Sequence, residues 1–184
     1  MQDQKKLDFE QIYAEYQPKI FRYISRLTNA VEAEDLTQDV FLKVSRALER
    51  FRGDSQVSTW LYRIATNSVI DHSRSVACRQ NTLESRLDDT CEAQTRVIWT
   101  DQEEASLEEM LLEKQRFNCF TDFIQKLPMS YRLIVILSEL EQLTSQEIAA
   151  ILGLSQEAVK IRLHRSRERL FQELKEHCQP EEWL

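Results

Sequence analysis

The chain has 184 residues, with only two glycines, three prolines and a formal net charge of −7. This length allows one domain or two small ones, and the composition, which lacks the alternating apolar runs of strands, favours an almost wholly helical protein. Since no segment has the roughly 18 apolar residues of a membrane span and the N-terminus lacks a signal peptide's apolar core, we expect a cytoplasmic protein without membrane insertion.

Two amphipathic helices are predicted first. Apolar residues recur at helical spacing from Phe9 to Leu27, with a break or kink expected at Pro18. A second helix runs from about residue 32 to residue 51, with one buried side, and Gly53 follows its end.

A third helix follows a polar loop, and Ser58 or Thr59 can serve as its N-cap. Its apolar positions are Trp60, Leu61, Ile64, Ala65, Val69 and His72. We expect the three helices to pack as one bundle, which forms a first domain over residues 1–80.

Charge is distributed unevenly along the chain. Residues 1–80 carry 12 Lys/Arg and 11 Asp/Glu, residues 81–115 carry 3 and 10, and residues 116–184 carry 9 and 10. The acidic excess therefore lies in the middle segment. Its polar, aperiodic composition predicts an acidic flexible linker over residues 81–115, disordered in isolation.

The second domain is expected over residues 116–184, as four helices. The first ends at Pro128, the second spans about Tyr131 to Leu140, and the last two are joined by a turn at Gly153. The sequence thus predicts an all-α protein with two small helical domains.

Residues 144–159 have the pattern of a helix-turn-helix. Thr144 and Glu147 match a capping box, Gly153 can adopt the positive φ of the turn, and Ser155 can cap the following helix. In that helix five cations between Lys160 and Arg169 are opposed only by Glu168. Such a helix suits a major groove, although a solvated basic face on a packing helix is the simpler alternative.

The spacing of the cysteines and histidines gives little support for a metal site or a redox site. The cysteines are irregularly spaced and are expected to be reduced thiols: Cys78, Cys91, Cys119 and Cys178. The three histidines are far apart in the sequence, and the adjacent His177 and Cys178 have poor chelating geometry. We therefore predict no metal, no cofactor and no catalytic residue, which argues against a nuclease.

Three blocks in the first domain resemble region two of extracytoplasmic-function sigma factors, in the same order and spacing: residues 33–43, 51–54 and 59–67. Residues 116–174 are similar to region four of that family. The resemblance implies a non-enzymatic alternative sigma factor that directs core RNA polymerase to promoter DNA. It also implies a role in a stress or envelope response and an anti-sigma factor that holds the protein inactive. The acidic linker would thread the polymerase channels, where it could imitate a nucleic-acid backbone.

The resemblance also implies three sets of site residues. The residues implied to dock on the clamp helices of the polymerase's largest subunit are Asp35, Gln38, Asp39, Phe41, Leu42 and Lys43. Those implied to read the opened minus-ten element are Phe51, Arg52, Arg63, Asn67 and Asp71. Those implied to contact the minus-thirty-five element are Lys160, Ile161, Arg162, His164, Arg165 and Arg167. Region four would also meet the polymerase flap.

The sequence leaves open the role of Trp60, the base preference at two positions and one alternative function. Trp60 could stack on DNA, but a tryptophan beside an apolar stripe is more often part of a core. Asp71 and Ile161 depart from the residue types common in the family, which puts base preference at both positions in doubt. The main alternative function is a plain helix-turn-helix regulator that binds duplex DNA without polymerase and uses its N-terminal bundle to sense a ligand or dimerise.

Overall fold

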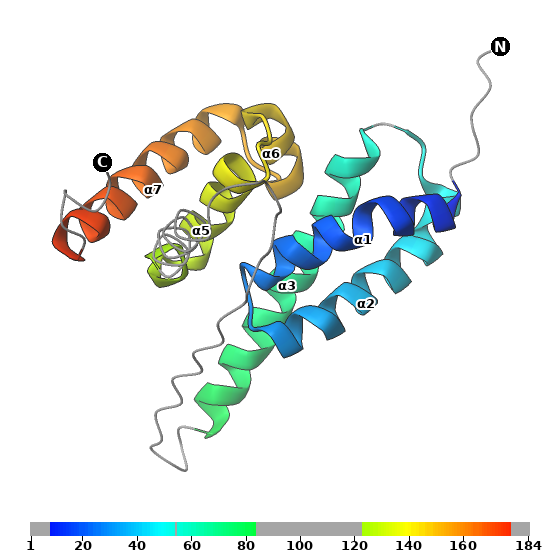
Figure 1. The fold of residues 1–184 in the computed structure, drawn as a ribbon, viewed down its shortest axis with the longest axis horizontal. Helices are drawn as coiled ribbons and strands as arrows, with labels where there is room; N and C mark the ends of the chain where they lie inside the picture. Colours follow the sequence, from blue (N-terminus) through cyan, green and yellow to red (C-terminus); the bar gives the residue numbers. More distant parts are fainter. Residues whose placement is uncertain (1–7, 54, 84–122, 178–184) are drawn as a thin grey trace, which may run out of the picture. The chain divides into compact units, whose positions relative to one another are not determined.

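The computed structural model describes residues 8–53, 55–83 and 123–177 of the chain. These residues are helical apart from short connections, so the predicted all-helical fold is confirmed in them (Figure 1). The chain divides into two compact units. The first contains α1 to α3, and the second contains α5, η2, most of α6 and α7.

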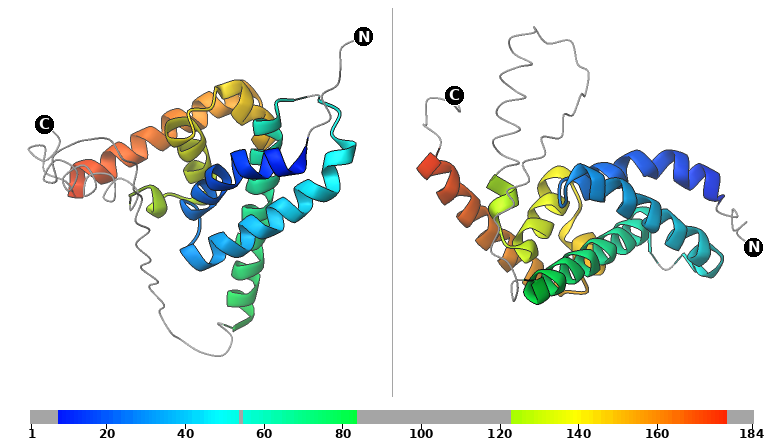
Figure 2. Two further views of the ribbon diagram at one scale, coloured as in Figure 1. Left: turned by 45° about the vertical axis from the view of Figure 1, so that its right-hand side comes forward. Right: turned by 90° about the horizontal axis from the view of Figure 1, so that it is seen from below.

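The first unit is built from α1 (Phe9–Ser25), α2 (Ala30–Ala47), the short 3-10 helix η1 (Leu48–Arg50) and α3 (Val57–Leu83). α1 and α2 lie side by side and run in opposite directions, and α3 crosses both (Figures 1 and 2). Side chains of the preceding residues cap the first two helices. Asp8 accepts a hydrogen bond from the amide of Glu10 at 3.2 Å, and Asn29 accepts one from the amide of Glu32 at 2.9 Å.

The core of the first unit follows the apolar spacing of the three helices. Its fully buried positions recur every three or four residues, which turns one stripe of each helix inward. They are Ile20, Tyr23, Ile24, Ala33, Val40, Val44, Leu61, Ala65 and Val69. Burial of each large side chain among them stabilises the unit by roughly 1.5–3 kcal/mol.

The sequence suggests a break or kink at Pro18, and of these the break is absent, because α1 runs continuously from Phe9 to Ser25. A proline inside a helix removes one backbone hydrogen bond and costs about 3 kcal/mol in isolation. Here Ile12 before the proline and Ile20 after it are both buried, and Pro18 itself is exposed. Packing on both sides of Pro18 therefore holds the helix together.

The ends of α3 also differ from prediction. The amide of Trp60 donates to the carbonyl of Gln56 at 3.1 Å, so the helix begins at Val57. Ser58 and Thr59 consequently lie in its first turn instead of capping it. At the other end α3 reaches Leu83, three residues into the predicted linker, and residues 84–115 lie outside the described ranges.

The second unit contains a helical segment at residues 123–126, α5 (Met129–Val135), the π-helical turn η2 (Ile136–Leu140), α6 (Ser145–Leu152) and α7 (Gln156–His177). The amide of Glu141 donates to the carbonyl of Ile136 at 3.0 Å, which closes the wider turn of η2. α5 packs against α7. The buried centre is continuous through residues 133–137.

Arg132 fastens α5 to the segment before it. Its Nη2 donates to the backbone carbonyls of Gln125 and Leu127, the second at 3.1 Å. These carbonyls belong to the end of a helix, where backbone acceptors lack helical partners. Burial lowers the pKa of the Arg132 guanidinium from its ordinary value.

Within the described ranges no helix is both long and apolar enough to cross a membrane.

Candidate nucleic-acid interface

α6 and α7 form the predicted helix-turn-helix. The Thr144 hydroxyl accepts a hydrogen bond from the amide of Glu147 at 3.3 Å, and the Glu147 carboxylate accepts one from the amide of Thr144 at 2.8 Å. This reciprocal pair is a capping box, as the sequence indicates. It sets the start of α6 and therefore the direction in which α6 enters the turn.

The turn itself depends on Gly153. Its φ of 65° and ψ of 37° lie in the left-handed region, which a glycine adopts without the strain that a side chain would add. The amide of Leu154 then donates to the carbonyl of Ala149 at 3.0 Å. Ser155 caps α7, because its hydroxyl accepts from the amide of Ala158 at 3.1 Å.

α7 presents one apolar side to its own unit and one polar side to solvent. Its buried residues recur at helical spacing: Val159, Leu163, Ser166 and Leu170. As a result, the six residues implied in minus-thirty-five contact are all exposed: Lys160, Ile161, Arg162, His164, Arg165 and Arg167. Ile161 is 53% exposed, which is unusual for so large an apolar side chain.

Two of these six side chains have acidic partners. Nε and Nη2 of Arg167 both donate to Oε1 of Glu139 in η2, at 3.0 and 2.6 Å. Nδ1 of His164 lies 3.3 Å from Oε2 of Glu168, one turn further along α7. The guanidinium of Arg167 is thus held by a carboxylate that a phosphate would have to displace.

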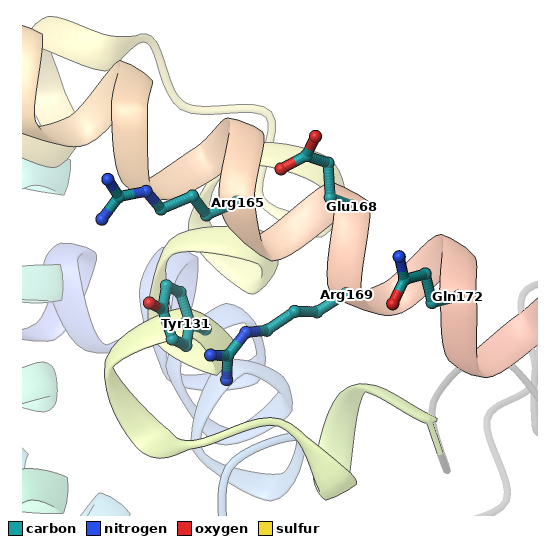
Figure 3. A pocket seen from close by; sticks show the side chains of 5 residues that line it. All are labelled: Tyr131, Arg165, Glu168, Arg169 and Gln172. Carbon is teal, nitrogen blue, oxygen red and sulfur yellow. The ribbon is translucent and has the colours of Figure 1, made fainter.

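A shallow open hollow lies beside the same helix. It has a volume of about 420 Å³ and is lined by Tyr131, Arg165, Glu168, Arg169 and Gln172. Figure 3 shows the side chains of Arg165 and Arg169 extending from α7 on the side where Tyr131 of α5 lies. The Arg169 guanidinium lies over the Tyr131 ring, 4.7 Å from its centroid. Tyr131 of α5 therefore contacts Arg169, as Glu139 of η2 contacts Arg167.

The predicted docking residues lie on α2, and most of them are accessible. Asp35, Gln38, Asp39 and Lys43 are exposed, and Leu42 is 53% exposed. Phe41 differs, because it is only 3% exposed and its ring packs edge-on against Tyr13 of α1, with 4.9 Å between the centroids. Phe41 thus supports the α1–α2 contact from within and offers no surface of its own.

A second shallow hollow lies next to those residues, between α1 and α2. Its volume is about 270 Å³ and its lining comes from both helices: Tyr13, Gln17, Phe21, Glu34, Thr37 and Gln38. Tyr13 is 46% exposed at this place. Because the apolar residues of α1 have the spacing of core positions, the sequence does not indicate this surface.

The loop before α3 holds two of the predicted minus-ten residues. The ring of Phe51 packs on Trp60, with 4.8 Å between the centroids, and both side chains are half-buried. Trp60 is therefore neither a full core residue nor an open platform. Arg52 is exposed, and Gly53 has a positive φ of 75°.

The other minus-ten residues lie along α3. Asn67 and Asp71 are one turn apart and both exposed. Arg63 is half-buried one turn before Asn67, and its buried Nε has no hydrogen-bond partner among the described residues. Among all the residues that the structure describes, no group of three His, Cys, Asp or Glu side chains is placed to hold a metal ion. Cys91, Cys119 and Cys178 lie outside the described ranges.

Comparison with protein families assigns both units. Residues 12–77 match the family described as sigma-70 region 2, and residues 117–170 match the one described as sigma-70, region 4. The first match includes α2 and most of α3, and the second includes the helix-turn-helix.

Curated relatives extend the similarity over most of the chain. The chain is 35% identical over 168 residues to the ECF RNA polymerase sigma-E factor of Escherichia coli (strain K12), covering 90% of this chain and 85% of the relative. It is 32% identical over 169 residues to the ECF RNA polymerase sigma factor SigW of Bacillus subtilis, covering 91% and 89%.

Solved structures share the fold. One is the sigma factor RpoE in complex with the anti-sigma factor NepR from Bartonella quintana, with a TM-score of 0.71, 23% identity, and coverage of 94% of this chain and 99% of that one. Another is CnrH in complex with the cytosolic domain of CnrY, with a TM-score of 0.63, 23% identity and coverage of 92% and 88%.

Proposed function

The chain belongs to the extracytoplasmic-function sigma factors of the sigma-70 family, and from that premise we propose how its surfaces select a promoter for core RNA polymerase. Sigma factors are transcription initiation factors without enzymatic activity. The observation that carries the proposal is that one chain combines an exposed polar face on α2, exposed polar residues on α3 and an exposed cationic face on α7. Polymerase bound to the face on α2 would place the other two faces on promoter DNA together.

Docking on polymerase is assigned to the exposed side of α2. Asp35, Gln38 and Asp39 offer acceptors and amide groups, and Leu42 adds an apolar contact. Charged groups around an apolar centre steer association and fix register. We assign Phe41 a supporting role under this surface because its side chain is buried. The clamp helices of the largest subunit are the proposed partner, and the flap is the proposed partner of the second unit.

Minus-ten contact is assigned to α3 and the loop before it. Unpaired bases are bound by stacking on flat side chains and by hydrogen bonds to their edges. The accessible part of this set is Arg52, Asn67 and Asp71, and the half-buried part is Phe51 and Arg63. Asn67 can donate and accept at once, which suits a base edge. Asp71 can only accept when ionised, so it favours an amino group over a carbonyl.

Minus-thirty-five contact is assigned to the exposed face of α7. Arg165 suits the edge of a guanine, and the aliphatic Ile161 suits a thymine methyl group. Lys160 and His164 stand beside them, and Arg162 and Arg167 flank the helix where backbone phosphates would lie. Of the two flanking arginines, Arg162 is the stronger candidate, since Arg167 is bound to Glu139.

Regulation by an anti-sigma factor is part of the proposal. RpoE of Bartonella quintana and CnrH are both described in complexes, with the anti-sigma factor NepR and the cytosolic domain of CnrY respectively. We propose an inhibitor of the same kind for this chain, acting in the cytoplasm and released by a stress or envelope signal.

Reconstitution with core polymerase tests the proposal. The full chain would be mixed with catalytic core and a library of promoter fragments, and initiation would be followed by transcript sequencing. We expect specific start sites that depend on the chain. Specific binding of duplex DNA without any effect on core would instead support a plain helix-turn-helix regulator.

Two substitutions separate docking from promoter opening. Asp39→Arg should weaken the affinity for core at least tenfold, because a reversed charge at an interface is strongly unfavourable. Asn67→Ala should leave that affinity unchanged and reduce promoter opening. Glu15→Arg is the matched control, since Glu15 is an exposed carboxylate on α1. The opposite pattern would contradict the assigned faces.

A further inference from the structure

We propose that Thr66 and Ser68 are positioning residues that fix the rotation of α3, so that Asn67 between them faces the DNA. The inference rests on the proposed function, which assigns Asn67 to the minus-ten element. Neither flanking residue belongs to the sets described above. Both are buried, and each is joined by its side chain to a different neighbouring helix.

The first tether joins α3 to α1. The Thr66 hydroxyl donates to the carbonyl of Tyr62 at 2.7 Å, which uses its one proton. The Tyr23 hydroxyl, 2.8 Å away, must therefore donate to Oγ1 of Thr66. Tyr23 and Thr66 are both fully buried, and a buried donor left without its acceptor is costly. This geometry opposes any turn of α3 that carries Thr66 away from α1.

The second tether joins α3 to α2. Nζ of Lys43 donates to Oγ of Ser68 at 2.7 Å, and Ser68 is 3% exposed. A hydrogen bond from an ammonium group is shorter and stronger than one between neutral groups. Lys43 is itself one of the residues implied to dock on polymerase, and it is exposed on α2. The second tether thus links the docking helix to the residue beside the proposed reader.

The two tethers together hold the orientation of Asn67. Successive residues of a helix are turned by about 100° about its axis. With Thr66 held towards α1 and Ser68 towards α2, Asn67 is turned outward, and it is exposed. Among the described residues none forms a hydrogen bond with the Asn67 side chain. Its amide is therefore held in place by its neighbours and remains available to a ligand.

The test compares base preference among variants of the full chain bound to core polymerase. Fork-junction DNA fragments randomised across the minus-ten element would be selected with each holoenzyme and sequenced. Asn67→Ala identifies the base position that the proposed reader controls. Ser68→Ala should reduce discrimination at that same position about fivefold, the size expected when one orienting hydrogen bond is lost. Tyr23→Phe, which removes the donor to Thr66, should act in the same direction.

Two controls separate positioning from general loss of stability. Ser75 is a serine on the same helix whose hydroxyl bonds to the carbonyl of His72 in its own helix, so Ser75→Ala should leave base preference unchanged. Val69→Ala opens a cavity in the core without removing either tether, because Val69 is fully buried and adjacent to Ser68. It should lower the melting temperature more than Ser68→Ala does and leave base preference unchanged.

The outcomes separate a failure of the reader assignment from a failure of the positioning role. If Asn67→Ala alters no base preference, the assignment of the reader fails and this inference fails with it. If Asn67→Ala alters preference while Ser68→Ala and Tyr23→Phe do not, only the positioning inference is overturned. It is also overturned if Val69→Ala relaxes preference as much as Ser68→Ala.

A double-mutant cycle tests the partner of Ser68. Lys43→Met and Ser68→Ala would be made singly and together, and base discrimination measured in holoenzyme at saturating chain concentration, so that weaker docking does not contribute. If the two side chains act through one bond, the double variant should discriminate no worse than the poorer single variant. Multiplicative losses would contradict the link between α2 and the reader.

Discussion

The proposed readers of the two units are held in place by different kinds of interaction. In the first unit the exposed Asn67 is neutral, and the buried hydroxyls on either side of it bond to two other helices, one to the buried Tyr23 on α1 and one to the exposed Lys43 on α2. In the second unit the readers are mostly exposed cations on one helix, and Arg167 among them pairs with the exposed carboxylate of Glu139. The first arrangement suits the edges of unpaired bases, and the second suits a charged duplex.

This difference has a physical consequence for salt. Buried hydrogen bonds are little affected by ionic strength, whereas exposed ion pairs and phosphate contacts are screened. We therefore expect the salt dependence of promoter binding to arise mainly from the second unit. The base preference of the first unit should change little with salt.

The largest expected effect comes from breaking the core that supports the second unit. Ile148 of α6 is 1% exposed, so Ile148→Ala should lower the free energy of unfolding by about 2–4 kcal/mol. Ile161→Ala is the matched control, because Ile161 is 53% exposed on α7 and its truncation should change stability by less than about 0.5 kcal/mol. Denaturant unfolding checks both values. Equal losses would show that the described burial is wrong.

The next largest effect distinguishes residues of α7 that contact bases from residues of α7 that contact phosphates. Arg165→Ala should cost about 1–3 kcal/mol in holoenzyme binding to the preferred promoter and relax the preference at one position. Arg162→Ala should weaken all promoters alike and lower the slope of log affinity against log salt by about one. Titrations at several salt concentrations measure both. A uniform loss from Arg165→Ala would move Arg165 from the readers to the phosphate contacts.

A smaller effect is expected at the capping box of α6. Thr144→Ala removes the acceptor for the Glu147 amide and should destabilise the second unit by about 1 kcal/mol. Thr144→Ser keeps the hydroxyl and should recover most of that loss. Thermal unfolding measures the difference, and the first unit should be unaffected if the two units unfold separately.

The smallest expected effect concerns the ion pair between Glu139 and Arg167, and it tests directly whether exposed charges in the second unit control DNA binding. Glu139→Gln removes the charge that holds Arg167, and exposed pairs of this kind are worth only about 0.2–1 kcal/mol. If Arg167 meets a phosphate, the substitution should raise affinity for duplex DNA up to about fivefold, with the gain largest at low salt. Glu10→Gln on α1, at an exposed carboxylate with no assigned role, is the matched change of charge in the other unit and should leave the affinity unchanged. Reduced affinity in Glu139→Gln would mean that the carboxylate orients Arg167 for binding instead of competing for it.

Local features of the chain could be predicted well from the sequence. The capping box at Thr144, the positive φ of Gly153 and the cap at Ser155 all depend on residues within four positions of each other, and all three are confirmed. The spacing of apolar residues on α2 and α7 likewise predicted which side of each helix is buried. Short-range geometry and periodicity were sufficient here.

Features that depend on distant contacts could not be predicted. Glu139 and Arg167 are 28 residues apart, and Lys43 and Ser68 are 25 apart, so no local pattern indicates either pair. The burial of Phe41 follows from its contact with Tyr13 on another helix. The same reason explains Pro18, where packing on both sides outweighs the local preference against a proline.

The π-helical turn η2 bears on how the cationic surface of α7 can change during evolution. A turn of this kind is what an α-helix becomes when one residue is inserted. Deleting a residue between Ile136 and Leu140 would restore the ordinary helix and turn Glu139 by about 100° relative to α5, away from Arg167. A difference of one residue in length, which an alignment records as a gap, would then separate relatives whose arginine is tethered from those in which it is free.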